Sequence, residues 1–421
     1  MSLSSLRATS PYAILAMLCA AYAMSFFHRV CPAVLSMDLM QDFALDGTTF
    51  SLISSTTMLG YALTQIPSGI MADIIGGRRT ISLFQVLAGL AVVVFTLCDS
   101  ISSALVCRFI LGLVLAANIP AYKILAERVP AKDYARFTTI LTCCGVLGSL
   151  LAASPLVAVS NLVGWRAALM AAGCFTVFLG LALFVLLREP ETGDKRETRT
   201  IRENVRALKQ GIAVVVRLRQ YWLVFVWFTF AIGSMFSLVT MWWGGFLMQG
   251  NGLSKEAAGL SMSIMSLAPL PLALVVPWIS ENIVHSRRLF LMLAALLEAF
   301  VFGFIWLNGE PLSFLPLTVL GTMVTVGTNA LGVLCFTMVR ETVPLPTLAT
   351  ASGLMNAAGP ASAAVIQLVF GMIISSSLEG GSSSYAAYSQ AFGFMFAGSL
   401  VSVAATILLK DTLGRSYGDG K

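Results

Sequence analysis

Charged residues are scarce in this chain of 421 residues, at 11% for Asp, Glu, Lys and Arg together. A soluble domain carries about 25%, so this chain has too little charge to cover a water-exposed surface. Only two histidines occur, and no two of the eight cysteines form a Cys-x-x-Cys pair, which excludes the usual zinc patterns. The phosphate-binding pattern Gly-x-x-x-x-Gly-Lys-Ser/Thr is also missing. We therefore expect no metal, no other cofactor and no direct use of ATP.

Long apolar runs take the place of charge. Apolar residues make up 57% of the chain, and they fall in blocks near the ~20 residues that a helix needs to cross a bilayer. The first block is too long for the apolar core of a signal peptide, so we interpret it as a helix. We predict an all-α membrane protein with twelve transmembrane helices, at 12–37, 49–71, 81–98, 102–126, 136–160, 166–188, 221–248, 256–279, 288–308, 312–338, 346–376 and 385–409.

A charged stretch at 189–220 divides the blocks into six before and six after. We predict an N-terminal six-helix bundle at 1–188 and a C-terminal six-helix bundle at 221–421, joined by a cytoplasmic linker that is partly helical and lies on the membrane surface. A weak repeat supports this division, since the pattern Glu-x-Val-Pro at 127–130 recurs at 341–344. Two related halves facing each other across a central cavity are the architecture that such repeats build.

The basic residues predict the orientation. With both termini inside, Arg166 and Lys255 are the only two of the 26 Lys and Arg residues in loops on the outer side. This positive-inside bias explains the net charge of +6 without a nucleic-acid partner, because the bases lie beside lipid headgroups. We expect a multi-pass protein of the cytoplasmic (inner) membrane. Cys98 and Cys107 flank a short outer loop. They either form a disulfide or serve as small packing residues.

The most informative motif is Gly-x-x-x-Asp-x-x-Gly-x-Arg-Arg, formed by Gly69, Asp73, Gly76, Arg78 and Arg79. It resembles the loop between helices 2 and 3 of the major facilitator superfamily of transporters, and the resemblance implies the major facilitator fold. In that family the Asp lies near the N-terminus of helix 11 on the inner side, where the helix dipole favours an anion, and the Gly permits close helix approach. We expect these residues to act in gating, by contacts that break when the halves rock.

The loop at 278–288 aligns with this motif. It keeps two arginines, Arg287 and Arg288, but has Asn282 in place of the Asp and His285 in place of a Gly. The second half therefore carries a partial copy of the loop, which agrees with duplication.

Further residues of the first half narrow the resemblance. The sequence at 108–121 resembles helix 4 of the anion:cation symporter family, which includes sugar-acid carriers and the sialin and vesicular-glutamate branch. Arg29 resembles that family's arginine in helix 1, and 65–69 and 164–166 are also similar. The lysosomal peptide-transporter branch, with a similar arginine and outline, is the alternative.

Four charged side chains lie inside predicted helices: Arg29, Arg108, Lys123 and Glu298. Such residues are costly in a bilayer and usually face a cavity. The resemblance places helices 1, 4, 7 and 10 around the cavity, so all three cations line it, whereas Glu298 lies on the peripheral helix 9. Arginine binds a carboxylate through two parallel hydrogen bonds and keeps its charge. We predict that Arg29 and Arg108 bind a substrate carboxylate; the alternative is that one of them ties helices together through backbone carbonyls.

Two positions depart from the family. Sugar-acid carriers typically have an Asp before the helix 1 arginine and a Glu seven residues after the helix 4 arginine, where this chain has His28 and Leu115. Proton coupling is therefore either absent or assigned to His28. A bound anion favours a protonated imidazole, which makes His28 a candidate proton carrier; the alternative is a hydrogen-bonded packing residue.

Other polar residues complete the predicted cavity. Tyr122 lies two seven-residue steps after Arg108, so the two share a face of helix 4. Lys123, near the inner end, either guides the anion, closes a gate or snorkels to the headgroups. The second half has no cation in its lining helices, and we expect Asn329 and Asn356 to contact the uncharged part of the substrate. Helix 7 carries Trp242 and Trp243, for which we predict an aromatic-belt position at the outer surface.

Together these features predict a secondary transporter that moves a small organic anion (a carboxylate, sugar acid or sulfonate) across the lipid bilayer by alternating access. We expect a monomer, and a proton or another ion is the candidate co-substrate. The alternatives are a peptide or amino-acid carrier and a transporter-like anion sensor. A drug-efflux pump would have an apolar cavity with acidic residues, opposite to this one. No nucleophile–base pair lies near a predicted membrane face, so we expect no enzyme.

Overall fold

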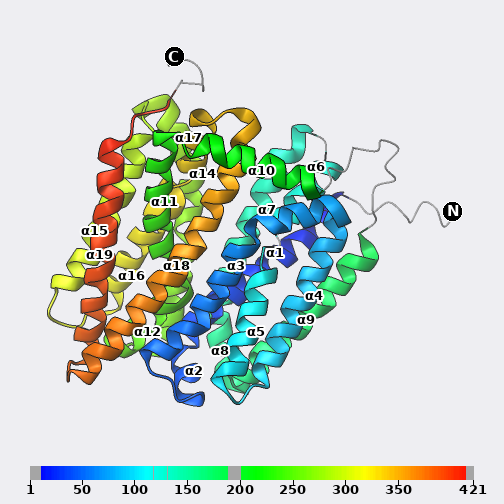
Figure 1. Cartoon of the computed structure of the whole chain (residues 1–421). Coiled ribbons are helices and arrows are strands. Elements are labelled where there is room, and N and C mark those ends of the chain that lie inside the picture. The colour runs from blue at the N-terminus through cyan, green and yellow to red at the C-terminus, as the bar shows by residue number, and fades with distance from the viewer. Residues whose placement is uncertain (1–10, 117, 130, 188–200, 414–421) are drawn as a thin grey trace.

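The computed structural model describes residues 11–116, 118–129, 131–187 and 201–413, and every regular element in these ranges is a helix (Figure 1). The N-terminal half contains α1 (Pro11–Val34), α2 (Ser36–Asp42), α3 (Gly47–Ile75), α4 (Gly77–Thr96), α5 (Ile101–Val114), α6 (Asn118–Arg128), α7 (Ala131–Leu151), α8 (Ser154–Val163) and α9 (Trp165–Leu186). The connecting helix α10 (Ile201–Val215) crosses one end of the molecule in Figure 1.

The C-terminal half is more often interrupted, by short π-helical turns η2 to η5 and one 3₁₀ turn, η6. In order it contains α11 (Arg219–Ser237), η2 (Leu238–Trp242), α12 (Trp243–Gly245), η3 (Phe246–Gly250), α13 (Lys255–Leu267), α14 (Pro269–Ile279), η4 (Ser280–Val284), α15 (Arg288–Leu307), α16 (Phe314–Thr325), η5 (Val326–Leu331), α17 (Leu334–Thr342), η6 (Leu345–Thr347), α18 (Leu348–Glu379) and α19 (Ser384–Leu408).

Eleven segments of the described chain are long and apolar enough to cross a membrane, and α3 is not among them. The predicted span at 49–71 lies inside α3, whose 29 residues extend over about 43 Å, more than the ~30 Å apolar core of a bilayer. Serine, threonine and Gln65 lower its hydropathy. Most of these polar side chains are buried, so α3 can be polar because its neighbours, and not lipid, surround it.

Several predicted spans are two helices in the structure. The span at 102–126 becomes α5 and α6, and the span at 136–160 becomes α7 and α8. Pro155 occupies the first turn of α8, where its missing N–H has no partner to lose. Breaks of this kind expose backbone groups, and they are tolerated inside a membrane protein where neighbouring helices cover them.

The two halves meet along α3 and α18, which run antiparallel through the centre of the molecule (Figure 1). Glycines make the approach possible at one end: a β-carbon on Gly371 would lie 2.6 Å from the carbonyl oxygen of Gly47. At the other end Gly353 faces Ile66. We call the end with α10 the linker side and the end with α2 the α2 side.

Polar contacts between the halves gather on the α2 side. Lys255 binds Asp38 at 2.7 Å, Asn161 donates to Glu256 at 2.7 Å, and the N–H of Thr48 donates to Ser375 at 2.9 Å. On the linker side no hydrogen bond or ion pair joins α6 to α17 within the residues that the structure describes. The molecule is therefore in a state whose α2 side is closed.

One contact on the α2 side is a direct backbone approach. Gly244 in α12 packs against the carbonyl of Ala33 in α1, so that a β-carbon at position 244 would overlap that oxygen. Close approach through a glycine is common between membrane helices. This contact joins the two halves directly on the α2 side.

Replacing Gly244 by leucine should force α12 away from α1 and open the α2 side. We expect the distance between spin labels at Ser100 and Glu310 to increase, as measured by pulsed EPR. Gly309→Leu is the control, because no atom lies within 4 Å of its would-be β-carbon, and it should leave the distance unchanged. If Gly244→Leu gives the wild-type distance, this contact does not hold the α2 side closed.

Candidate functional site

Arg29 lies where the two halves face each other. Its guanidinium carbon is 4.5 Å from the ring centroid of Phe26, 4.2 Å from that of Tyr61 in α3 and 5.8 Å from that of Phe236 in α11. The residue is 4% exposed. Among the described residues it forms neither a hydrogen bond nor an ion pair, so aromatic rings alone surround this buried cation.

Arg108 occupies a different environment, inside the N-terminal half. Its guanidinium lies 4.1 Å from the ring centroid of Phe95 in α4, and it is close enough to His28 and Cys31 to act on both electrostatically. The side chain is 2% exposed and its Nε has no partner. No carboxylate pairs with Arg108 within the part of the chain described.

His28 points toward the N-terminal half and away from Arg29, its neighbour in sequence. Its Nε2 lies 2.9 Å from the hydroxyl of Thr176 in α9, while Nδ1 is enclosed and has no partner. Position 28 therefore faces Arg108. An aspartate here, as in the sugar-acid carriers, would stand beside the helix 4 arginine, whereas this chain leaves that arginine without an acid.

Lys123 has a partner that the sequence did not suggest. Its Nζ binds Asp73 at 2.6 Å and the carbonyl of Ala72 at 2.7 Å, which joins α6 to the end of α3. Asp73 keeps 58% of its side chain exposed. We expected Asp73 beside the N-terminus of α18; in this state, with the α2 side closed, it pairs within its own half.

The rest of the gating motif shapes the turn between α3 and α4. Gly76 has a φ of +91°, which favours glycine. Arg78 donates to the carbonyl of Leu187 at 2.9 Å, so it ties the turn to the end of α9; Arg79 is exposed. A β-carbon on Gly69 would meet only an ordinary contact, 3.6 Å from Ile119, so close packing does not require glycine there in this state.

The uncharged candidates remain apart from one another. Tyr122 shares a hydrogen bond of 3.2 Å with Thr142 in α7. Asn329 lies exposed on η5, and its amide is 3.9 Å from the sulfur of Met235. Asn356 is half-buried on α18. The structure therefore gathers no compact polar cluster around Arg29, whose environment is dominated by rings.

The prediction for Trp242 and Trp243 was wrong. Both side chains are buried, at 1% and 0% exposed, and do not form a belt at the membrane surface. Trp242 donates to the carbonyl of Gln367 at 3.1 Å. They pack α11–η3 against α18 and α19, through Phe370 and Phe392 among others.

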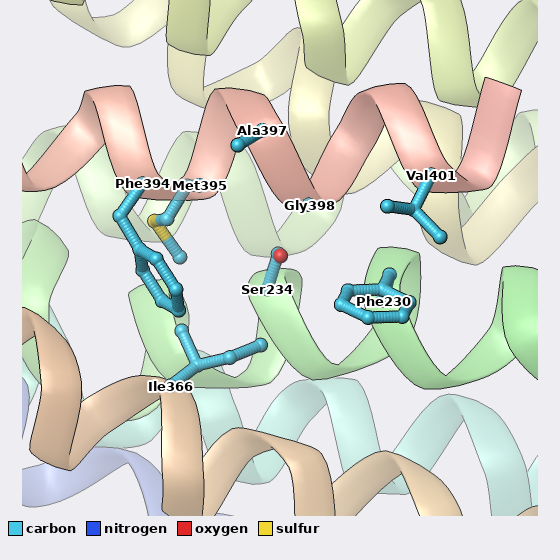
Figure 2. Close-up of a pocket in the computed structure, with 8 residues that line it drawn as sticks. All are labelled: Phe230, Ser234, Ile366, Phe394, Met395, Ala397, Gly398 and Val401. Atoms are coloured by element: carbon cyan, nitrogen blue, oxygen red, sulfur yellow. The ribbon is translucent and has the colours of Figure 1, made fainter.

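An apolar cavity of about 230 Å³ lies between α11, α18 and α19 (Figure 2). Ser234 supplies the one hydroxyl in a lining that is otherwise carbon and sulfur: Phe230, Ile366, Phe394, Met395, Ala397, Gly398 and Val401. Without a charged group it cannot neutralise an anion, and it is distinct from the surroundings of Arg29.

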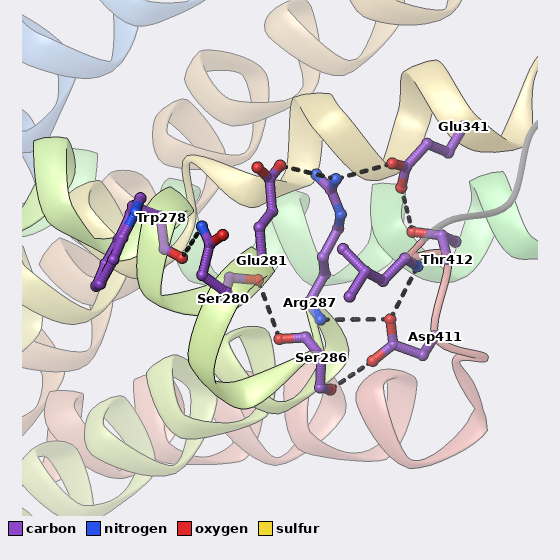
Figure 3. Close-up of polar contacts among 10 residues, drawn as sticks. Trp278, Ser280, Glu281, Ser286, Arg287, Glu341, Asp411 and Thr412 are labelled. Carbon is purple, nitrogen blue, oxygen red and sulfur yellow. Dashed lines mark hydrogen bonds and ion pairs between the residues drawn. The ribbon is translucent and has the colours of Figure 1, made fainter.

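On the linker side the partial copy of the motif forms a closed network (Figure 3). Arg287 binds Glu281 at 3.1 Å and Glu341 at 2.9 Å, and Thr412 donates to Glu341 at 2.7 Å. The network joins the ends of η4, α15 and α17 to the segment after α19. The alignment of 278–288 with 69–79 pointed to Arg287 and not to Glu341 or Thr412, which are distant in sequence.

The fold defines a class, an all-helical multi-pass membrane protein built from two halves. The chain matches the family model of the Major Facilitator Superfamily over residues 13–366. It therefore belongs to that superfamily, whose members and relatives here are transporters and not enzymes.

Curated relatives and solved structures agree with this family. The chain is 25% identical to the niacin transporter NiaP of Acinetobacter baylyi, over 64% of this chain and 67% of the relative. It is 24% identical to the 4-hydroxybenzoate transporter PcaK of Pseudomonas aeruginosa, over 68% of each chain. An inward-facing bacterial homologue of the human lysosomal transporter Spinster has a TM-score of 0.79 at 18% identity, covering 95% of this chain and 97% of that one.

Asp411 supports the network by capping α15. It accepts hydrogen bonds from the Ser286 hydroxyl and from the backbone N–H groups of Arg287 and Arg288. Burial alone would raise the pKa of Asp411, but these bonds and one from the N–H of Leu413 outweigh burial, so the pKa is lowered. The stabilisation is therefore complete above about pH 4 and is lost as the pH falls through the folded-state pKa.

Asp411→Asn should lower the stability of the purified protein at pH 7 by about 1 kcal/mol, as expected for a capping carboxylate at a helix N-terminus. Thermal unfolding at a series of pH values measures this. The difference from wild type should shrink below about pH 4, where Asp411 itself takes up a proton. A difference that is constant with pH would contradict a role for its charge.

Proposed function

We propose that this superfamily member is a secondary transporter of a small organic anion, which it moves by alternating access. Arg29 carries the proposal: it is buried, positively charged, without an anionic partner among the described residues, and in contact with both halves. A buried cation in this position lacks the ion pair that would offset its desolvation. A substrate carboxylate supplies it through paired hydrogen bonds to the guanidinium.

The relatives favour this substrate class. Those that match carry niacin, 4-hydroxybenzoate, sulfoacetate, tartrate and gallate by name, and one carries the neutral myo-inositol. The rings of Phe26, Tyr61 and Phe236 around Arg29 suit the flat body of an aromatic acid. We therefore place aromatic monocarboxylates first among the candidates, with Tyr122, Asn329 and Asn356 contacting the uncharged part as the halves close.

Arg108 is the second anion-binding residue of this proposal. Its guanidinium is stacked on Phe95 and free of carboxylates within the described chain, so it adds positive potential to the N-terminal half and binds the anion when the halves approach. Lys123 belongs to the gate. We expect Asp73 to leave Lys123 and cap the N-terminus of α18 when the linker side closes, because both sites offer positive charge to the same carboxylate.

The basic loops orient the protein. If the linker side is cytoplasmic, as the positive-inside bias indicates, the state described here faces inward, and both termini lie in the cytoplasm. In a bacterial cell this places the transporter in the inner membrane. We propose that it acts as a monomer and that a proton accompanies the anion as a symported ion.

Arg29→Gln should weaken binding of the anion about 10- to 100-fold, the loss expected for hydrogen bonds to a charged group. A thermal-stability screen with aromatic acids, sugar acids, short carboxylates, sulfonates, dipeptides and neutral sugars identifies the ligand, because binding to the folded state raises stability. Arg108→Gln should abolish uptake while leaving expression intact. Arg217→Gln, an exposed arginine on the linker side, is the matched control and should bind as wild type.

Stabilisation by neutral sugars alone, unaffected by Arg29→Gln, would mean that the arginines are structural and that the anion assignment is wrong. Stabilisation by dipeptides in preference to simple acids would favour a peptide carrier of the same superfamily. Binding without uptake in proteoliposomes would indicate an anion sensor.

His28→Gln should remove the pH dependence of anion binding. The free Nδ1 of His28 accepts a proton most readily when an anion offsets the charge of Arg108, so binding and protonation strengthen each other. Titration calorimetry of the ligand from the screen, at pH 5.5 and pH 7.5 in two buffers, measures the protons taken up. If wild type and His28→Gln take up the same number of protons on ligand binding, His28 only packs against Thr176.

A further inference from the structure

The C-terminal half contains a carboxyl group that no role described so far uses. Glu298 in the middle of α15 is fully buried, and neither of its carboxyl oxygens has a hydrogen-bond partner. It lies ten residues after Arg288, which places it about 15 Å from the linker-side end of α15 and near the middle of a ~30 Å bilayer core.

No charged group in the described part of the chain pairs with Glu298. The elements packed against α15 are α19, η5, α16, α11 and α17. The segments α16 and η5 have no titratable residue. The other three carry titratable residues, but none of these is hydrogen-bonded to Glu298; they are Arg219 and Tyr221 of α11, Cys335, Arg340 and Glu341 of α17, and Tyr385 and Tyr388 of α19.

A carboxyl group in this environment is neutral, because an ionised one without a partner costs far more than taking up a proton. A neutral group that served packing alone would still donate its O–H to an acceptor, as buried polar groups generally do. Glu298 has no such acceptor in the described chain. The carboxyl group of Glu298 is therefore not tied to a neighbouring side chain or carbonyl in this state, and it is available to exchange a proton.

The neighbouring η5 is an element that can change. Its Gly327 faces Ala294, where a β-carbon would lie 3.5 Å from the Cα and carbonyl oxygen of Ala294. Glu298 is four residues from Ala294 and shares this face of α15. Asn329, in the same π-helical turn, is exposed. Such turns recur at functional sites. A π-helical turn holds one residue more than an α-helical turn, and when that extra residue shifts along the helix, the side chains between its old and new positions rotate by about 100°.

We propose that Glu298 is the proton-binding site of the C-terminal half: it carries a proton in the state described here, and a shift of register in η5 opens it to water and releases that proton as the transporter changes state. The step is the dissociation of a carboxylic acid into a carboxylate and a proton. The proposal rests on the transport function proposed above, and it adds a second proton-binding group, in the half opposite to His28.

Two measurements on the purified full-length protein test this without any substrate, so a failure of the anion assignment does not affect them. Infrared spectroscopy at pH 7 should show the C=O band of a buried protonated carboxylic acid in wild type, lost in Glu298→Gln. Pulsed EPR between labels at Glu127 and Arg340, on the ends of α6 and α17, should show wild type leaving the state described here as the pH rises. Glu298→Gln should remain in it at every pH.

Glu310→Gln, an exposed outer glutamate, is the control and should keep both the band and the pH response. Glu298→Asp retains a titratable group, and should keep both even if the glutamine variant folds poorly. A band missing from wild type, or surviving in Glu298→Gln, would overturn the assignment. A band lost in Glu298→Gln with an unaltered EPR response, or a wild type whose distances ignore pH, would reduce Glu298 to a neutral packing residue.

Discussion

Uncompensated charge in a low-dielectric interior is the constraint on which this molecule depends. The N-terminal half buries Arg29 and Arg108 without a carboxylate, and the C-terminal half buries Glu298 without a cation, within the described residues. They do not pair with one another, because Glu298 lies on a peripheral helix and the arginines lie on helices of the other half. We propose that each is satisfied from outside the chain, the cations by an anion and the acid by a proton. The fold thus keeps the buried cations and the buried acid apart, although pairing them would make the folded protein more stable.

The linker side shows how duplication produces unlike halves. In both, an arginine of the loop donates to backbone carbonyls at the end of the last helix, Arg78 to Leu187 and Arg288 to Thr406. In the C-terminal half Arg287 is then enclosed by Glu281 and Glu341. The N-terminal half leaves Asp73 largely exposed with Lys123. An exposed pair exchanges partners at little cost, so we propose that the N-terminal loop is the half of the gate that moves.

Hydropathy located most of the membrane spans, because a bilayer imposes a length and a composition on any helix that crosses it. Its signal is weakest where protein replaces lipid. The helix α3 contains the predicted span at 49–71 but is more polar than the other spans, because α18 and α5 cover its serines and threonines. The same reason misplaced Trp242 and Trp243: indole rings suit a membrane interface, but here they fill the space between helices of one half.

The superfamily, the helical class, the positive charge of the N-terminal half and the loop motif with its copy could be predicted from the sequence, because they follow from composition and from residues close together in the chain. The partner of each side chain could not be predicted, because it depends on contacts between distant segments. Lys123 finds Asp73 across 50 residues and His28 finds Thr176 across 148, and no local pattern contains such pairs. Packing also turned His28 toward Arg108 and Arg29 toward the other half, since successive residues on a helix point about 100° apart.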